Sequence, residues 1–126
     1  MGIVYVKGTV RHGNKEREAE FLVDSGATYS LLRKEIWQEL RLEPKREIEL
    51  VLADGTRIRR FLSECYIKLP FDSAEGHTPV ILGEEGDDEN LLGIVTLEIL
   101  GFIIDPIKRE IRPMRILLKP ILKGRR

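Results

Sequence analysis

An apolar run that ends in a single acid constrains this chain more than any other feature. Residues 21–28 read Phe-Leu-Val-Asp-Ser-Gly-Ala-Thr, so a β-rich segment stops at Asp24 and small turn-forming residues follow at once. A strand that ends in a carboxylate places that group at the rim of a sheet, and Gly26 permits backbone conformations closed to other residues. Asp-Ser-Gly is also a common solvated turn, so the rest of the chain must decide between a site and a turn.

The composition favours one compact domain. The 126 residues are 42% hydrophobic and 33% charged, and the formal net charge is zero. A neutral chain gives no support for a nucleic-acid or membrane-surface partner, and no apolar run is long enough to span a bilayer. Because Cys65 is the only cysteine and no signal peptide is recognisable, we expect no internal disulfide and a cytoplasmic location.

Alternating and β-branched segments predict a mainly β chain. Two hairpins are expected, at Gly13-Asn14 and at Ala53-Asp54-Gly55-Thr56. Strands are predicted over 2–11, 17–23, 47–53, 56–69, 79–82, 102–105 and 109–114, with 70–78 as a loop. The inward face of the long arm 56–69 is predicted to hold Phe61, Cys65, Ile67 and Leu69.

Two short helices are expected between the strands. Ser30 is predicted to cap a helix over 31–40, in which Leu32, Ile36 and Leu40 share one face. A second, mostly apolar helix is predicted over 94–100, with Gly101 in the position of a C-cap. We find no internal repeat in the sequence.

Two charged segments are predicted to be solvated. The first is the arginine cluster Arg57, Arg59 and Arg60 beside the second hairpin, for which a nucleic-acid patch is the alternative interpretation. The second is the acidic run 84–90, whose spacing does not match a calcium loop. His12 and His77 lie in predicted loops and lack partner ligands, so we expect no metal site and no cofactor.

A strand-end aspartate can serve as both acid and base only beside a second carboxylate. A lone carboxylate is ionised at neutral pH, whereas two carboxylates about 3 Å apart share one proton and supply both a base and an acid. The chain is too short for two such lobes. A symmetric dimer with Asp24 on its two-fold axis would supply the second carboxylate.

Three motifs, in this order, resemble the retropepsin-like (retroviral-type) aspartic proteases, especially their small prokaryotic single-domain members. Residues 21–27 resemble the hydrophobic-hydrophobic-Asp-Thr/Ser-Gly-Ala signature, and the hairpin through Asp54-Gly55 falls where the family has its flap. Leu91-Leu92-Gly93, with the following helix and strand, resembles the second hydrophobic-hydrophobic-Gly motif. The resemblance covers roughly residues 17–106.

The resemblance implies a mainly β fold: a retropepsin-like closed β-barrel or sandwich lobe with a flap hairpin and one or two short helices. This protease domain would span residues 1–114. The C-terminal extension 115–126 lies outside the match. Its five Ile and Leu residues are too many for a free tail, so we expect them to contact a dimer partner before the last residues fray.

The resemblance also assigns roles to individual residues. Asp24 would be the catalytic carboxylate, one per subunit, in a loop supported by Ser25, Gly26, Ala27 and Thr28. The strand beneath this loop, the psi-loop, would be formed by Leu91, Leu92 and Gly93. The flap over the substrate would be Leu52, Ala53, Asp54, Gly55 and Thr56, and apolar pockets would include Leu32, Val51 and Ile81.

The implied function is a homodimeric aspartic endopeptidase. It would hydrolyse peptide bonds of extended polypeptides with a water activated between two Asp24 carboxylates, without metal or cofactor. The alternative is a catalytically inactive, dimeric peptide-binding or scaffold domain with the same fold. The expected partners are a peptide or protein substrate and a second copy of the chain. Two departures stand out: Gly55 is the only glycine at the flap tip, and Ile94 follows Gly93 where the retroviral motif has Arg.

Overall fold

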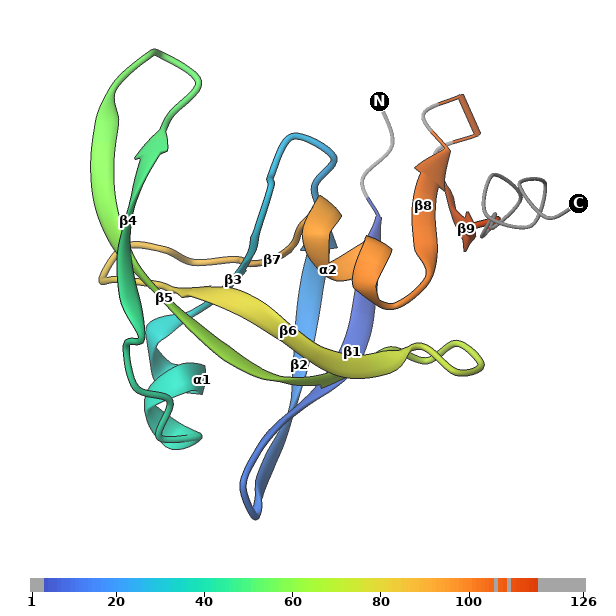
Figure 1. Ribbon diagram of the computed structural model, residues 1–126, viewed down its shortest axis with the longest axis horizontal. Coiled ribbons are helices and arrows are strands. Elements are labelled where there is room, and N and C mark those ends of the chain that lie inside the picture. Colours follow the sequence, from blue (N-terminus) through green and yellow to red (C-terminus); the bar gives the residue numbers. More distant parts are fainter. Residues whose placement is uncertain (1–3, 106, 109, 116–126) are drawn as a thin grey trace, which may run out of the picture.

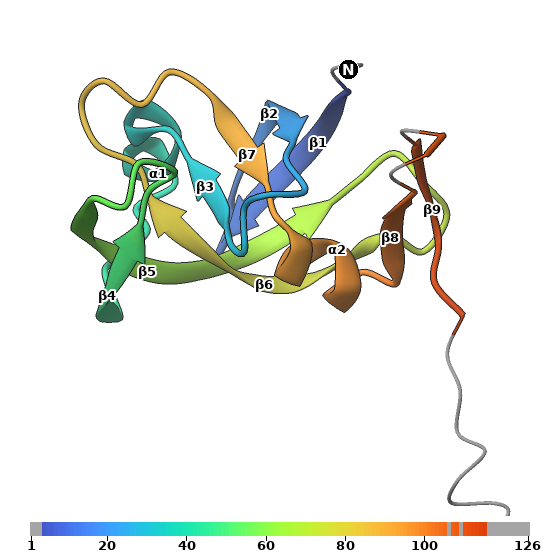
Figure 2. The same cartoon turned by 90° about the horizontal axis from the view of Figure 1, so that it is seen from above.

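The strands of the computed structural model, which describes residues 4–105, 107–108 and 110–115, form a closed barrel. Six strands make the ring in the order β1-β2-β7-β3-β6-β5, and β1 pairs with β5 to close it (Figure 1). Outside the ring, β4 pairs with β5, and β8 and β9 form a separate two-stranded sheet beyond α2 (Figure 2). The predicted fold class, a mainly β closed barrel with two short helices, is confirmed.

The two predicted hairpins are present. Gly13 (φ 61°) turns the first and Gly55 (φ 88°) the second, in a conformation that favours glycine. The elements are β1 (Tyr5–His12), β2 (Lys15–Val23), β3 (Ser30–Leu32), α1 (Lys34–Glu39), β4 (Arg46–Val51), β5 (Arg57–Lys68), β6 (Glu75–Leu82), β7 (Asn90–Leu92), α2 (Ile94–Ile99), β8 (Phe102–Asp105) and β9 (Glu110–Pro113). The prediction for the C-terminal extension 115–126 concerns residues that, apart from residue 115, lie outside those the structure describes.

Three predictions about these elements are wrong. Ser30 does not cap a helix, because it belongs to β3, and α1 begins after Arg33, which offers no side-chain cap. The strand predicted at 79–82 begins at Glu75, because it pairs with β5 as far as Lys68. Phe61 is 45% exposed, because the alternation of β5 shifts where Leu62 and Ser63 are buried in succession.

The chain contains a structural repeat that we did not recognise in the sequence. The units β3–α1 and β7–α2 consist of a strand and a helix of the same lengths. Every strand and helix of the second unit begins and ends sixty residues after its counterpart in the first. Both helices are followed by a residue with positive φ, Arg41 (60°) and Gly101 (89°), which is the usual way to end a helix. The two units meet in the middle of the barrel, where Leu31 pairs antiparallel with Leu91.

Each unit inserts its short strand beside a longer one. β3 runs parallel to β6, and β7 runs parallel to β2 over the pairs from Phe21–Asn90 to Val23–Leu92. The loop before each short strand therefore emerges at a strand end. The first of these loops is 24–29 and the second is 83–89. The Asn90 side chain, at the start of β7, is buried, and its polar atoms are satisfied. Its amide nitrogen donates to Glu20 O (3.0 Å), and its amide oxygen accepts the Arg33 N–H (2.8 Å).

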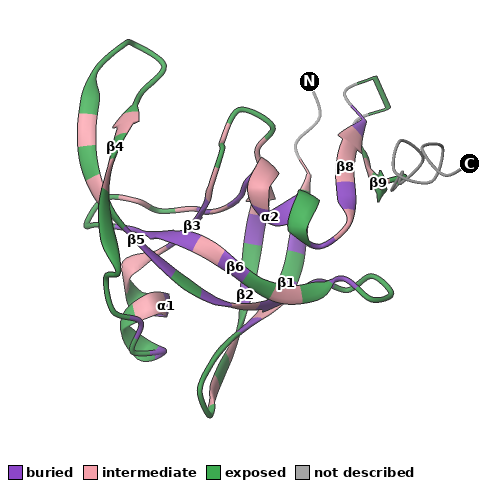
Figure 3. Cartoon of the chain, in the orientation of Figure 1, coloured by how far each residue is buried: buried purple, intermediate pink, exposed green. Residues whose placement is uncertain are grey.

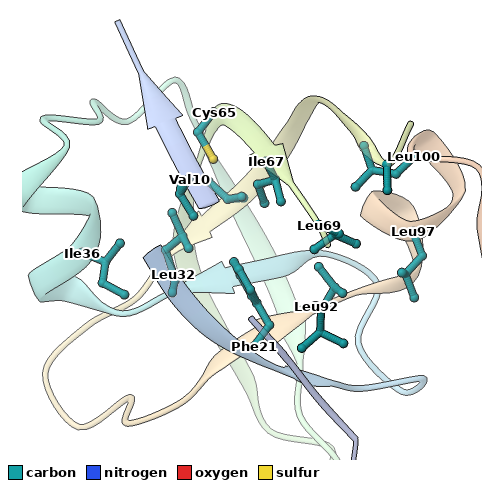
Figure 4. Packing of buried hydrophobic residues seen from close by; sticks show 14 of the residues in the cluster. Val10, Phe21, Leu32, Ile36, Cys65, Ile67, Leu69, Leu92, Leu97 and Leu100 are labelled. Carbon is teal, nitrogen blue, oxygen red and sulfur yellow. The ribbon is translucent and has the colours of Figure 1, made fainter. Parts of the chain in front are cut away.

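An apolar core fills the barrel (Figure 3). Phe21, Leu32, Ile67 and Leu92 are fully buried and pack in one cluster, so each contributes about 1.5–3 kcal/mol by burial (Figure 4). A second, smaller cluster, formed by Leu31, Leu62 and Ile81, lies apart from the first. Neither helix in the described part of the chain has the length and apolar character needed to span a bilayer.

Three buried hydroxyls connect the two units with β6. The Ser30 and Thr96 oxygens are 2.6 Å apart, and the Thr96 and Thr78 oxygens 2.8 Å. All three hydroxyls can donate in the same direction: Ser30 to Thr96, Thr96 to Thr78, and Thr78 to Pro79 O. Ser30 Oγ in turn accepts the Gly93 N–H at 3.0 Å. Each buried hydroxyl is thereby satisfied, as burial requires.

Replacing Thr96 with valine should destabilise the fold by about 1–3 kcal/mol, because Ser30 loses its acceptor and Thr78 its donor in a buried place. The matched control is Thr9→Val, a half-buried position on β1. The free energy of unfolding in urea would be compared for both variants. Equal stability of Thr96→Val and the parent would contradict the importance of this network.

Burial, with a smaller contribution from the Glu64 charge, raises the pKa of the Cys65 thiol to about 12. In the folded protein the thiol should therefore resist iodoacetamide at mildly alkaline pH, and urea-unfolded protein should react rapidly. The unfolded thiol ionises at lower pH, so this group's contribution to stability is complete below about pH 9 and is lost as the pH rises toward 12. Mass spectrometry of the alkylated chain, with and without urea, measures the effect.

Candidate functional site

Asp24 is the first residue after β2, at the end of a strand that pairs with both β1 and β7. It is half-buried, and its Oδ1 accepts the Gly26 N–H at 2.9 Å. The turn closes where the Ala27 N–H donates to the Asp24 carbonyl at 3.1 Å. Figure 1 shows this loop between the β4–β5 hairpin and α2, at the end of the barrel opposite the β1–β2 turn. The carboxylate is thus fixed at a barrel rim and remains accessible.

Main-chain hydrogen bonds fasten this loop to the start of α2. The Asp24 N–H donates to Leu92 O at 3.1 Å, and the N–H groups of Ile94 and Val95 donate to Ala27 O and Thr28 O, each at 2.9 Å. α2 has no side-chain N-cap, so these loop carbonyls satisfy donors that the first turn of a helix leaves unpaired. The loop and the helix start therefore stabilise each other.

Gly93 is required where the two segments cross. A Cβ at this position would lie 2.5 Å from the Tyr29 carbonyl carbon, 2.6 Å from its oxygen and 2.9 Å from the Ser30 nitrogen. All three atoms belong to the main chain and cannot move aside as a side chain could. Leu91, Leu92 and Gly93 lie next to the Asp24 loop, and Leu92 and Gly93 are buried.

A groove of about 570 Å³ runs beside the loop and along the part of the β4–β5 hairpin that adjoins its tip. Its floor is apolar. Gly26, Ala27 and Thr28 line it on the loop side, Leu50, Val51, Leu52 and Ile58 on the hairpin side, and Leu31, Ile81 and Leu91 between them. Charged residues occur in the lining at three positions, Glu49, Arg60 and Asp87. The groove is large enough for side chains of an extended peptide.

The predicted site residues separate into three places. Gly26, Ala27, Thr28, Leu52 and Leu91 line the groove, as do Val51 and Ile81. The hairpin tip, Ala53, Asp54, Gly55 and Thr56, is exposed and stands beyond the groove, with Asp54 Oδ1 accepting the Thr56 N–H at 2.9 Å. Ser25 instead lines an apolar hollow of about 250 Å³ with residues of α2 and β8.

Two placements differ from the sequence predictions. Leu32 is fully buried in the core and cannot line a pocket; its neighbour Leu31 lines the groove, because β3 is a strand and presents alternate residues to opposite faces. Arg60 is not part of a solvated arm, since only 16% of its side chain is exposed and it pairs with Asp87. The sequence holds a signal for this placement. Arg60 lies two residues from both Ile58 and Leu62, so it shares their face of the strand, whereas Arg57 and Arg59 lie on the other face.

The arrangement holds no evident metal site. Within the described ranges, no group of three or more His, Cys, Asp or Glu side chains is placed to hold an ion. His12 Nδ1 lies 3.0 Å from Leu40 O, and His77 packs edge-on against Tyr66. At the rim, the described residues present a carboxylate, main-chain N–H groups and an apolar groove.

Comparison with known proteins gives a consistent result. The model of a family described as gag-polyprotein putative aspartyl protease matches residues 10–98, a range that includes Asp24, the hairpin tip and Gly93. A retropepsin-like aspartic protease from Rickettsia conorii is similar in structure, with a TM-score of 0.56 and 24% identity over 83% of this chain and 77% of that chain. The retroviral protease-like domain of Ddi1 from Leishmania major has a TM-score of 0.55 and 16% identity over 92% and 91%. No curated protein sequence matches.

Replacing Gly93 with alanine should destabilise the protein by about 3 kcal/mol or more, because the new methyl group meets main-chain atoms on the aspartate loop. Gly76→Ala is the matched control. Its Cβ would meet only a Leu100 methyl group at 3.4 Å, so a change within about 1 kcal/mol is expected. Urea unfolding of both variants measures the difference, and similar losses would show that the crossing is not the cause.

Proposed function

The chain belongs to the gag-polyprotein putative aspartyl protease family and has the retropepsin-like fold, and on this basis we propose that it is a homodimeric aspartic endopeptidase. The observation that carries the proposal is the place of Asp24. It stands at a strand end in a loop held by main-chain bonds, and the residues next to it line an apolar groove. Asp24 would be the catalytic residue, one in each subunit.

The need for a dimer follows from the chemistry. A single ionised carboxylate can take a proton from water but cannot also give one to the oxygen of the amide under attack. Two carboxylates that share a proton supply both functions. Since one chain provides one such aspartate, the second would come from a second copy across a two-fold axis.

An apolar face beside the Asp24 loop supports this assembly. Ser25, next to the aspartate, borders a hollow whose other lining residues, apart from Glu98, are apolar: Ile94, Leu97, Phe102, Ile103 and Ile104. Ile99 on the same helix is 49% exposed. Apolar surface concentrated next to a candidate active site is typical of a protein interface. We propose that the partner subunit covers this face and that Ser25 contributes to the contact between the two loops.

The proposed reaction begins with an extended peptide in the groove. Its main chain would add to the protein as a strand, and its side chains would contact Leu31, Leu50 and Ile81. The β4–β5 hairpin would close over it as a flap. One Asp24 takes a proton from the attacking water while the other protonates the scissile carbonyl oxygen, which gives a tetrahedral intermediate. As the C–N bond breaks, the second Asp24 takes its proton back from that oxygen, and the first gives its proton to the departing amine nitrogen. No covalent enzyme intermediate is formed.

Replacing Asp24 with asparagine should abolish hydrolysis, because the amide can neither accept nor share the catalytic proton. The assay is cleavage of an unstructured protein at mildly acidic pH, followed by gel electrophoresis and mass spectrometry. The matched control is Asp88→Asn, an exposed aspartate outside the groove, which should cleave as the parent does. Equal cleavage by Asp24→Asn and the parent would overturn the proposal.

Solution mass provides an independent test. The proposal requires a species of about twice 14.5 kDa under assay conditions, measured by light scattering or native mass spectrometry. A chain that cleaves as a strict monomer would contradict the paired-aspartate mechanism. A dimer that binds peptides without cleaving them, whatever residue stands at 24, would instead favour a peptide-binding scaffold.

A further inference from the structure

One charged residue lies on the apolar face of the β4–β5 hairpin. The inward side of this hairpin carries Ile48, Leu50, Ile58 and Leu62, and Arg60 lies among them, directly across from Ile48. Its sequence neighbour Arg59 points to the other face and pairs with Glu47 in solvent. Arg60 therefore faces the groove, whereas Arg59 and Arg57 do not line it.

Arg60 is paired with the loop on the opposite wall. Its Nη1 donates to Asp87 Oδ2 at 2.7 Å, and its Nε lies 3.6 Å from Glu84 Oε2. Only 16% of the Arg60 side chain and 27% of the Asp87 side chain are exposed. Asp87 is held in turn, because the same Oδ2 accepts the Glu84 N–H at 2.7 Å. The pair joins the hairpin to the 83–89 loop across one end of the groove.

Burial makes this pair a weak source of stability. Removing two charges from water costs much of what their attraction returns, so an apolar pair of similar volume often stabilises a fold equally well. An ion pair in such a place, however, controls which charges can enter, since an unpaired charge of either sign would be left without a solvent shell. The third charged residue of the lining, Glu49, is neutralised by Arg57 at 2.9 Å in an exposed position.

We propose that Arg60 and Asp87 determine the charge specificity of the groove. Paired, they close one end of it and exclude charged peptide side chains from that end. Unpaired, each selects a side chain of the opposite charge. The proposal rests on the peptide-binding groove of the proposed function, and adds to it that a bound peptide carries a neutral residue at the position that reaches this pair.

The experiment measures peptide binding, so that it does not depend on cleavage. The full chain carrying Asp24→Asn is titrated into a fluorescent short host peptide of apolar residues, in which each position in turn is Glu, Gln or Lys. The otherwise unaltered protein should bind the Gln peptide more tightly than the Glu and Lys peptides at one position.

Two sets of substitutions then reverse the preference at that position. With Arg60→Met, Asp87 and Glu84 are left unpaired, and the Lys peptide should gain on the order of tenfold in affinity over the Glu peptide. With Asp87→Asn and Glu84→Gln together, the guanidinium is left unpaired, and the Glu peptide should gain by a similar factor. Arg59→Met, which removes a neighbouring arginine from the outer face, is the matched control and should leave the preference unchanged.

Each result has a defined meaning. If Arg60→Met and Arg59→Met show the same preference as the parent, the inference is overturned while the groove remains a peptide site. If no host peptide binds to the unaltered groove, the proposed function fails first and the inference with it. Circular dichroism and urea unfolding establish that each variant is folded. If Arg60→Met does not fold, the double variant Asp87→Asn, Glu84→Gln still tests the inference.

Discussion

The attachment of the Asp24 loop to the start of α2 is the constraint on which the rest of the site depends. Three main-chain hydrogen bonds link residues 24–28 to residues 92–95, and they form only because Gly93 lets two segments of main chain touch. Two of these bonds satisfy the first N–H groups of the helix, those of Ile94 and Val95. The position of Asp24 and the stability of α2 therefore depend on the same contacts. The buried hydroxyls of Ser30, Thr96 and Thr78 link these two segments to β6 as well.

The structural repeat gives the two loops of the barrel different tasks. The loop before β3 carries Asp24, which is accessible and held by a main-chain N–H. The corresponding loop before β7 carries Asp87, which is bound to Arg60 of the hairpin. One acid remains accessible at the rim, and the other joins the hairpin to the 83–89 loop at the groove. A single architectural unit, used twice, therefore builds both the rim that would act on a peptide and the wall that would select it.

Local sequence patterns were sufficient for β1, β2, β5 and both hairpins, because alternation and positive-φ glycines act over a few residues. They failed for β3, whose Ser30-Leu31-Leu32 continues the periodicity of α1 and becomes a strand through its pairing with β6 and β7. The repeat was hidden because residues 30–39 and 90–99 share only the Leu-Leu pair, and Arg33 stands where the second unit has Gly93. Asp24 and the glycine beneath it could be predicted from motifs. The pairing of Arg60 with Asp87 could not, since it depends on how a hairpin and a distant loop meet.

The barrel is closed unevenly. β1 and β2 pair over eight residues, but β1 and β5 only over three, from Thr9–Lys68 to Arg11–Tyr66. Breaking this short junction converts the ring into an open sheet without disturbing the Asp24 loop or the hairpin. This junction is therefore one place where the native state can open, and amide protons of β1 that face β5 should exchange with solvent through this opening before those that face β2.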